Sequence, residues 1–465
     1  MTKQTLPELL ASSADKKFLF LGREGLFTQD EIARFLKKYD ITMTQYLEED
    51  VTAIIEPLNL NPVEEDISND AYDAKIPSFS LDMFEKLLSE SINDDELLMA
   101  IKLTNDQARI FRLLGNANIS ETLFVKLLMM YAWHEEDEDD RNDRDVIVYT
   151  LKRYIDIKPN EADIHYSYLT LRRLATEATN PKLLLALIGF PNFEFLIRGK
   201  EKVTLRETIA RNAYLDTEVI TKLVSLRDRR VDVALAGNAT VETILLKTLL
   251  NKEDTKIHEA LATNANIDNE SFKTLLSKED KVVQLLLLWQ KIDTERLDLI
   301  DAQALDETLF STIGANEHLD VEVIDNLIQR EYETLLCNLA QNSILSSEQL
   351  EIIYEKDMKA TLACLAMNVA MPVAFLEKFY SSYEEKEVQL ALAHNLSTPE
   401  HILRALFEKD DLEIQRNLAS NPSIPLDILD ILKVDTRLQN ELAKNPILIK
   451  GYETVLDYDK KAVQF

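Results

Sequence analysis

The sequence is poor in glycine, proline and cysteine. Its 465 residues include 8 glycines, 12 prolines and two cysteines. So few helix-breaking residues beside a hydrophobic content of 46% exclude a fibrous or disordered chain and favour a helical fold with a sizeable core. Cys337 and Cys364 are too few for a disulfide framework and lack zinc-ligand spacing, so we expect neither to have a chemical role and the compartment to be reducing.

Long apolar runs and excess basic charge are also missing. The richest apolar run, Val282 to Trp289, is far shorter than the roughly 20 residues that cross a bilayer, and the N-terminal MTKQTLPELLASSADKK has no signal-peptide core. We therefore expect a cytoplasmic protein without membrane insertion. With 82 acidic residues against 52 basic ones, the net charge of −30 repels phosphate backbones. This charge argues against nucleic acid and favours basic partners or simple solubility.

A repeated phrase dominates the second half of the chain: an apolar residue, Ala, any residue, then Asn. Its steps are 26 residues from Asn212 to Asn368, with Gln290 in one Asn position, and then 27, 26 and 24. Such a period indicates an array of one structural unit. The Asn positions, with an earlier copy at Asn116, are Asn116, Asn212, Asn238, Asn264, Asn316, Asn342, Asn368, Asn395, Asn421 and Asn445. We expect each Asn to bond to backbone in a turn, which is a structural role.

Each repeat is predicted to hold two helices. Apolar residues follow each Asn by seven, eight, eleven and twelve positions, as at Val323, Ile324, Leu327 and Ile328, and this spacing marks one helical face. Capping residues or prolines four positions after the Asn predict where this helix begins: Asp216, Asp268, Thr294, Asp320, Ser346, Pro372, Pro399 and Pro425. A shorter helix is expected to begin ten residues before the Asn, at Asp228, Asp254, Asp280, Asp306, Asp411 and Asp435. Neither helix can bury its apolar face alone, so we expect the units to stack as an α-solenoid.

The repeats resemble the leucine-rich repeat variant family over about residues 205–448. LASNPSIPLDILDIL at 418–432 and LAHNLSTPEHILRALFEKDDLEIQRN at 392–417 carry the resemblance. It implies a right-handed superhelix of two-helix repeats without strands. The family's N-terminal iron-sulfur cluster is not implied, because both cysteines lie inside repeats. HEAT-like stacking is the neighbouring alternative, although its usual period is longer.

The first 90 residues differ in kind from the repeats. Strands are predicted at 17–22 and within 41–57, a capped helix at 28–39, and a strand followed by a helix at 76–88. This order over residues 15–90 resembles a BRCT-type α/β module. Leu21 stands where that family places a phosphate-binding Ser or Thr, and Met83 or Phe84 where it places Trp. The resemblance therefore does not imply phosphopeptide binding.

These patterns divide the chain into four parts. They are an α/β module at 1–90, divergent helical repeats at 91–200, the regular array at 201–449, and a C-terminal cap or tail at 450–465. Within the second part, the acidic insertion at 134–145 is expected to be an exposed loop, since its charge opposes burial. The alternative reading of this insertion is a docking site for a basic partner or a divalent cation.

A locally basic stretch surrounds Arg211, Arg227, Arg229 and Arg230. These side chains could hold an acidic peptide or phosphates. The alternative is ion pairing with neighbouring acids such as Glu207 and Asp228, because charges on repeat helices usually form a solvated face.

No motif of catalysis is present. The sequence lacks GxGxxG, P-loop, HExxH and GxSxG patterns, and its six histidines are scattered. We therefore expect no catalytic residue, no cofactor and no metal. The sequence predicts a non-enzymatic scaffold whose curved surface engages a partner protein. Two alternatives remain: a nucleic-acid-binding or DNA-repair-associated repeat protein, and an enzyme with an unrecognised site.

Overall fold

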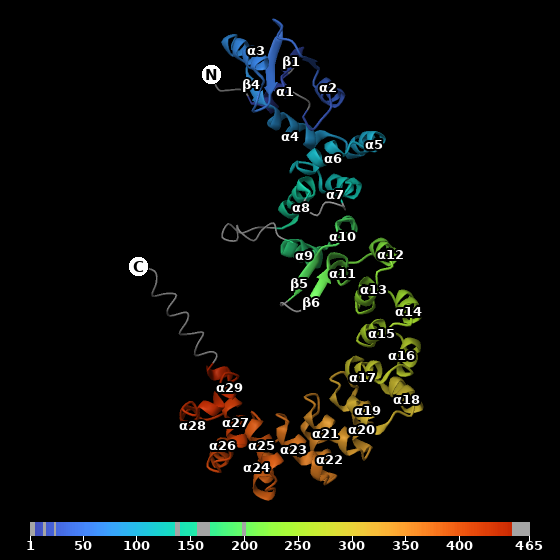
Figure 1. Ribbon diagram of the computed structural model, residues 1–465, viewed down its shortest axis with the longest axis vertical. Helices are drawn as coiled ribbons and strands as arrows, with labels where there is room; N and C mark the ends of the chain where they lie inside the picture. The colour runs from blue at the N-terminus through green and yellow to red at the C-terminus, as the bar shows by residue number, and fades with distance from the viewer. Residues whose placement is uncertain are drawn as a thin grey trace. The chain divides into compact units, whose positions relative to one another are not determined.

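The computed structural model describes residues 5–12, 15–22, 25–134, 140–155, 168–197 and 201–448 (Figure 1). The chain divides into two compact units, residues 1–234 and 235–465. It is mainly helical, as predicted, and a small parallel sheet lies near its N-terminus. The predicted tail at 450–465 lies outside the described residues.

The N-terminal module is built on a four-stranded parallel sheet with the order β2-β1-β3-β4. Its strands are β1 (Lys16–Phe20), β2 (Ile41–Thr44), β3 (Val51–Glu56) and β4 (Ser78–Ser80), and its helices are α1 (Leu6–Ala11), α2 (Gln29–Lys37), α3 (Pro62–Asp73) and α4 (Leu81–Ser91). Side chains alternate between the two faces of β1. Leu19 packs with Ala71 of α3, whereas the Phe20 ring contacts Phe84 of α4 at 5.0 Å. Helices therefore cover both faces of the sheet.

Helix α3 was missed because its sequence, PVEEDISNDAYD, is mostly polar and buries only Ala71. Its start is nevertheless strongly encoded. The Oδ1 of Asn61 accepts the N–H groups of Val63 and Glu64, and Pro62 occupies the first turn. The helix forms although its sequence has little apolar periodicity, because its capping residues fix its start and its few apolar side chains pack on one face of the sheet.

After the N-terminal module, the described part of the first unit, with its last helix ending just past residue 234, consists of short helices and one β-hairpin. The elements are α5 (Asp94–Thr104), α6 (Gln107–Leu114), α7 (Glu121–Met130), α8 (Arg141–Tyr154), α9 (Tyr168–Glu177), α10 (Pro181–Ile188), β5 (Glu194–Ile197), β6 (Glu201–Thr204), α11 (Leu205–Ala210), α12 (Thr217–Ser225) and α13 (Arg229–Ala236). The hairpin of β5 and β6 is antiparallel and was not predicted.

The predicted exposed loop at 134–145 is wrong for its second half. Asp140 caps α8, and residues from Arg141 onward are helical. Asp143 is buried although its side chain is polar, because it accepts several hydrogen bonds. Residues 135–139 lie outside the described part of the chain.

The second unit alternates two sets of helices (Figure 1). They are α14 (Thr243–Leu250), α15 (Thr255–Ala262), α16 (Asn269–Leu276), α17 (Asp280–Trp289), α18 (Thr294–Ala302), α19 (Glu307–Ser311) with the 3-10 turn Thr312–Ala315, α20 (Val321–Gln329), α21 (Glu333–Gln341), α22 (Ser347–Glu355), α23 (Lys359–Met367), α24 (Val373–Ser382), α25 (Lys386–His394), α26 (Glu400–Phe407), α27 (Leu412–Ser420), α28 (Leu426–Leu432) and, after the 3-10 turn Thr436–Leu438, α29 (Gln439–Leu442).

Helices of the same set pack on one another. Helix α21 contacts α23, α23 contacts α25 and α25 contacts α27, while α16, α18, α20 and α22 form a second row of contacts. Leucines at the first row, such as Leu339, Leu365 and Leu392, are fully buried between these helices. The apolar face of a helix in this row is therefore buried against the next helix of the same row, as α21 is against α23.

Helix starts in this unit largely follow the predicted caps. Ser346 and Gln349 form a reciprocal capping box at α22. Two predictions are off by one residue. Asp293, not Thr294, caps α18, and Glu279, not Asp280, precedes α17. In both places an acidic residue one position earlier occupies the cap.

Candidate functional site

The repeated asparagines form a ladder of buried hydrogen bonds through the second unit. The Nδ2 group of Asn368 donates to the carbonyl oxygens of Ala340 and Asn342 at 2.7 and 3.1 Å, and its Oδ1 accepts the N–H of Ala370. Equivalent pairs of bonds, to carbonyls 24 to 29 residues earlier, are made by Asn264, Asn316, Asn342, Asn395, Asn421 and Asn445. Gln290 donates to two such carbonyls at 2.9 Å each.

The asparagines of the first unit are also buried. Asn212 donates to the carbonyls of Ala175, Thr176 and Ala178, and Asn116 donates to the hydroxyl of Ser89. Asn238, in the second unit, accepts the N–H of Thr240. These amides are buried and hydrogen-bonded to the protein itself, so we assign them a structural role.

The four predicted arginines lie on three successive segments. Arg211 follows α11, Arg227 lies between α12 and α13 with a left-handed φ of 53°, and Arg229 and Arg230 begin α13. Arg211 pairs with Glu207 at 2.6 Å, and Arg230 pairs with Glu194 of β5 at 3.1 Å. The second partner was unforeseen because the hairpin was unforeseen. Bonds from Lys202 and Arg230 lower the pKa of Glu194.

An apolar groove of about 830 Å³ lies in the first unit and was not predicted from the sequence. It is formed by α7, the segment after it, α10 and α12, and α10 packs against both other helices. Its lining residues are Leu128, Met129, Tyr131, Trp133, Leu185, Ala186, Gly189, Thr217, Glu218, Thr221, Lys222 and Ser225. The groove thus has an aliphatic and aromatic floor with one polar wall, the exposed face of α12.

Aromatic packing fixes one wall of this groove. The Trp133 ring lies 5.0 Å from the Tyr131 ring and 4.3 Å from the buried Phe190 ring. Met129, by contrast, is 41% exposed. An apolar side chain left open beside ordered aromatic rings is a feature of partner-binding surfaces. The available sequence signal was the aromatic pair directly after an apolar helix.

A cluster of polar side chains contacts the segment that carries these aromatic rings. The Tyr131 hydroxyl donates to Asp143 Oδ1 at 2.8 Å, and the His134 N–H donates to Asp143 Oδ2 at 2.9 Å. Burial, reinforced by the Asp143 bond, raises the pKa of Tyr131 above its ordinary value. Asp140 accepts the N–H groups of Asn142 and Asp143. The carboxylates therefore anchor the start of α8 to the segment that carries Trp133.

The same cluster contains the residues of the described chain that could hold a metal ion. One ligand atom each from His134, Asp140 and Asp143 lies within 4.8 Å of the others. Nitrogen and carboxylate ligands of this kind suit zinc and similar ions. The carboxylate oxygens of the cluster also accept backbone and phenol hydrogen bonds, which anchor the start of α8.

A buried ion pair joins the α/β module to the helices that follow it. Arg109 of α6 contacts Glu31 of α2 at 2.5 Å, and both side chains are almost fully buried. Burial opposes ionisation of Glu31, but bonds from Arg109 and Thr28 outweigh it and lower its pKa. The carboxylate of Glu31 is therefore compensated by Arg109 and by the cap of α2.

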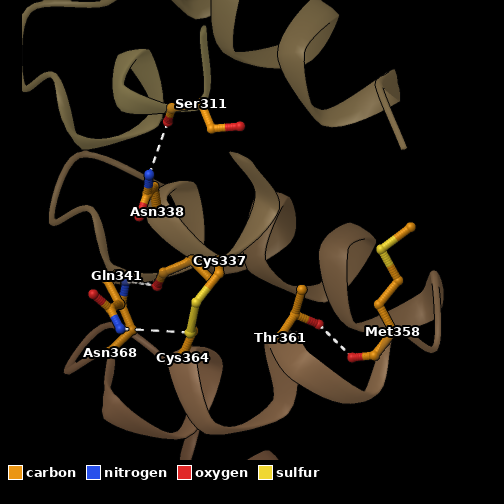
Figure 2. The surroundings of a disulfide bond; sticks show 9 residues. Ser311, Cys337, Asn338, Gln341, Met358, Thr361, Cys364 and Asn368 are labelled. Carbon is orange, nitrogen blue, oxygen red and sulfur yellow. Dashed lines mark hydrogen bonds between the residues drawn. A yellow bond between two sulfur atoms is a disulfide. The ribbon is translucent and has the colours of Figure 1, made fainter. Parts of the chain in front are cut away.

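The expectation that the two cysteines have no chemical role is wrong. Cys337 of α21 and Cys364 of α23 are joined by a disulfide, with a Cα–Cα distance of 5.4 Å (Figure 2). The sequence signal was their separation of 27 residues, one repeat step plus one. This spacing places them on helices of the same set that pack directly together.

Among the described helices, none has both the length and the apolar content needed to cross a membrane. Comparisons of the chain with protein-family models, curated proteins and solved structures gave no significant match.

Proposed function

We propose that this chain is a non-enzymatic scaffold that binds a partner protein, and that its repeats form an α-solenoid similar to leucine-rich repeat variant proteins. Two features support this architecture. The Asn and Gln290 side chains bond to carbonyls about one repeat earlier, and helices of one set pack on the next helix of that set. Stacked units of this kind create extended surfaces that suit protein recognition. The N-terminal module, with its parallel sheet and flanking helices, is proposed to be a BRCT-like cap.

The groove between α7, α10 and α12 carries the functional proposal. Its floor combines Met129, Trp133 and Leu185 with few polar groups, and its position between α7, α10 and α12 suits the binding of a helix with apolar anchors. The occupant is an amphipathic helix of another protein, with apolar anchors on one face. Because the chain has a net charge of −30, the opposite face of that helix is expected to be basic.

The test compares two exposed apolar positions. Met129→Glu places a charge in the groove, whereas Ile244→Glu, at a residue 77% exposed in the second unit, does so away from it. Proteins captured from native cell extract by the full chain are identified and their direct binding is then measured. Met129→Glu should remove one binding hot spot and weaken binding by at least about tenfold, whereas Ile244→Glu should leave binding unchanged.

Three results would contradict the proposal. They are the absence of any protein partner, equal binding by wild type and Met129→Glu, and steeply salt-dependent binding of DNA or RNA in place of a protein. The last result would favour the nucleic-acid-binding alternative, because phosphate contacts release counterions.

A further inference from the structure

The two cysteines of the chain lie on neighbouring helices of the second unit. Cys337 lies in the middle of α21 and Cys364 in the middle of α23 (Figure 2). Their Cα atoms are 5.4 Å apart, within the usual range for a disulfide. The bond therefore requires no movement of the backbone.

Contacts other than the disulfide also join the two helices. Leu336 and Leu339 of α21 and Leu365 of α23 are fully buried, and Asn368 donates to the carbonyl of Ala340 at the end of α21. Asn338 also ties α21 to the end of α19 through the carbonyl of Ser311 at 2.8 Å (Figure 2). Reduction should consequently leave the two thiols facing each other, ready to be oxidised again.

The two sulfurs differ in access and in surroundings. Cys337 is half-buried, whereas Cys364 is only 7% exposed. The side-chain amide of Gln341 donates to the sulfur of Cys364 at 3.4 Å. A donor at this distance favours the thiolate, the form that attacks a disulfide. Cys337 is thus the position that an external reagent reaches, and Cys364 is the internal nucleophile.

We propose that Cys337 and Cys364 form a reversible thiol–disulfide site whose substrate is a low-molecular-weight disulfide such as glutathione disulfide, entering at Cys337. The Cys337 thiolate attacks one sulfur of glutathione disulfide and expels one glutathione thiolate. The Cys364 thiolate then attacks the Cys337 sulfur and expels the second glutathione thiolate. Two electrons pass from the protein to glutathione, and the two protons lost by the protein thiols are taken up by the two released thiolates.

Oxidation closes a covalent loop around α22. The cysteines are 27 residues apart, and the chain between them contains the whole of α22. A cross-link of this size restricts the opened states of the segment that it encloses. The redox state should therefore control how readily α21, α22 and α23 separate, while leaving their folded arrangement unchanged.

The first experiment follows the reaction in the full-length chain. Reduced wild type, Cys364→Ala and Cys337→Ala are mixed with glutathione disulfide and analysed by intact mass. The mass of wild type should fall by that of two hydrogen atoms, without retained glutathione. Cys364→Ala should trap one glutathione on Cys337, about tenfold faster than Cys337→Ala traps it on buried Cys364. Circular dichroism of both variants establishes that they are folded.

Contrary outcomes are equally definite. If wild type stays reduced in excess glutathione disulfide, the site does not exist. Equal or reversed trapping rates would refute entry at Cys337. A bond that excess reduced glutathione cannot open in the folded chain would refute reversibility.

The second experiment measures the consequence. Hydrogen exchange in α22 and α23 should be about tenfold slower in oxidised than in reduced wild type, since exchange follows local opening. The double variant Cys337→Ala/Cys364→Ala should show no dependence on redox conditions, and neither should α27 in any form. Equal exchange in oxidised and reduced wild type would overturn the proposed control of opening.

Discussion

Replacing one asparagine of the ladder tests how the second unit is held together. Asn395 is 1% exposed, and its Nδ2 donates to the carbonyls of Ala366 and Asn368 at 2.8 and 2.9 Å. Its Oδ1 accepts the N–H of Ser397 at 2.8 Å. Asn395→Ala removes all three bonds and leaves two carbonyls buried without this donor. At a net value of about 1 kcal/mol for each bond, we expect a loss of about 3 kcal/mol.

Urea denaturation followed by circular dichroism measures this loss, with Asn251→Ala as the control. Asn251 is exposed at the end of α14, so its substitution should change the free energy of unfolding by no more than about 0.5 kcal/mol. Because a repeat array need not unfold in one step, hydrogen exchange in α25 and α27 gives a second readout. Equal stability of Asn395→Ala and Asn251→Ala would refute the reasoning.

Asn395→Asp adds a readout that simple loss of packing cannot imitate. The substitution keeps the shape but places a carboxylate against two carbonyl oxygens. The folded state should therefore bind a proton at this site more tightly than the unfolded state, in which an Asp has a pKa of about 3.9. The variant should therefore be closest to wild type in stability below about pH 4 and should lose stability relative to wild type as the pH rises. A pH-independent difference would contradict repulsion as the cause.

Two further predictions concern ionisable side chains. Partial burial opposes ionisation of Asp268, but bonds from Lys247 and Ser271 outweigh it and lower the pKa of Asp268 to about 2. Asp268→Ala should cost about 1 kcal/mol at neutral pH, and this cost should shrink as the pH falls from about 4 toward 2, as acid titration of urea midpoints would reveal. Asp143→Asn should lower the raised pKa of Tyr131, but not to its ordinary value, because the burial of Tyr131 remains. Ultraviolet titration measures this pKa, with Tyr131→Phe as the variant that identifies the signal of Tyr131.

The positions of helices in the second unit could be predicted because their signals are local. A capping residue followed by apolar residues on one face defines a helix wherever it occurs, as Ser346 and Gln349 illustrate. The errors were also local. Asp293 and Glu279 took the places assigned to Thr294 and Asp280, because two adjacent residues can serve as a cap and the sequence pattern does not rank them.

Features that depend on packing partners were harder to predict. Helix α3 exists because a sheet face needs covering, and Asp143 is buried because Tyr131 and His134 supply donors from another segment. Neither relation leaves a periodic trace in the chain. The groove depends on the same kind of relation, since its lining comes from three helices separated by long stretches of sequence.

The disulfide lies between these two cases and shows what periodicity adds. In an ordinary sequence, two cysteines 27 residues apart carry no spatial information. In an array whose steps are close to 26, the same spacing places them on adjacent helices of one set, at nearly equivalent positions within the repeat. A repeat therefore converts sequence separation into distance, and any pair of reactive residues separated by one step can be examined as a possible contact. The cysteine pair satisfies that condition while the rest of the chain supplies no competing thiol, so pairing within the chain needs no choice among partners.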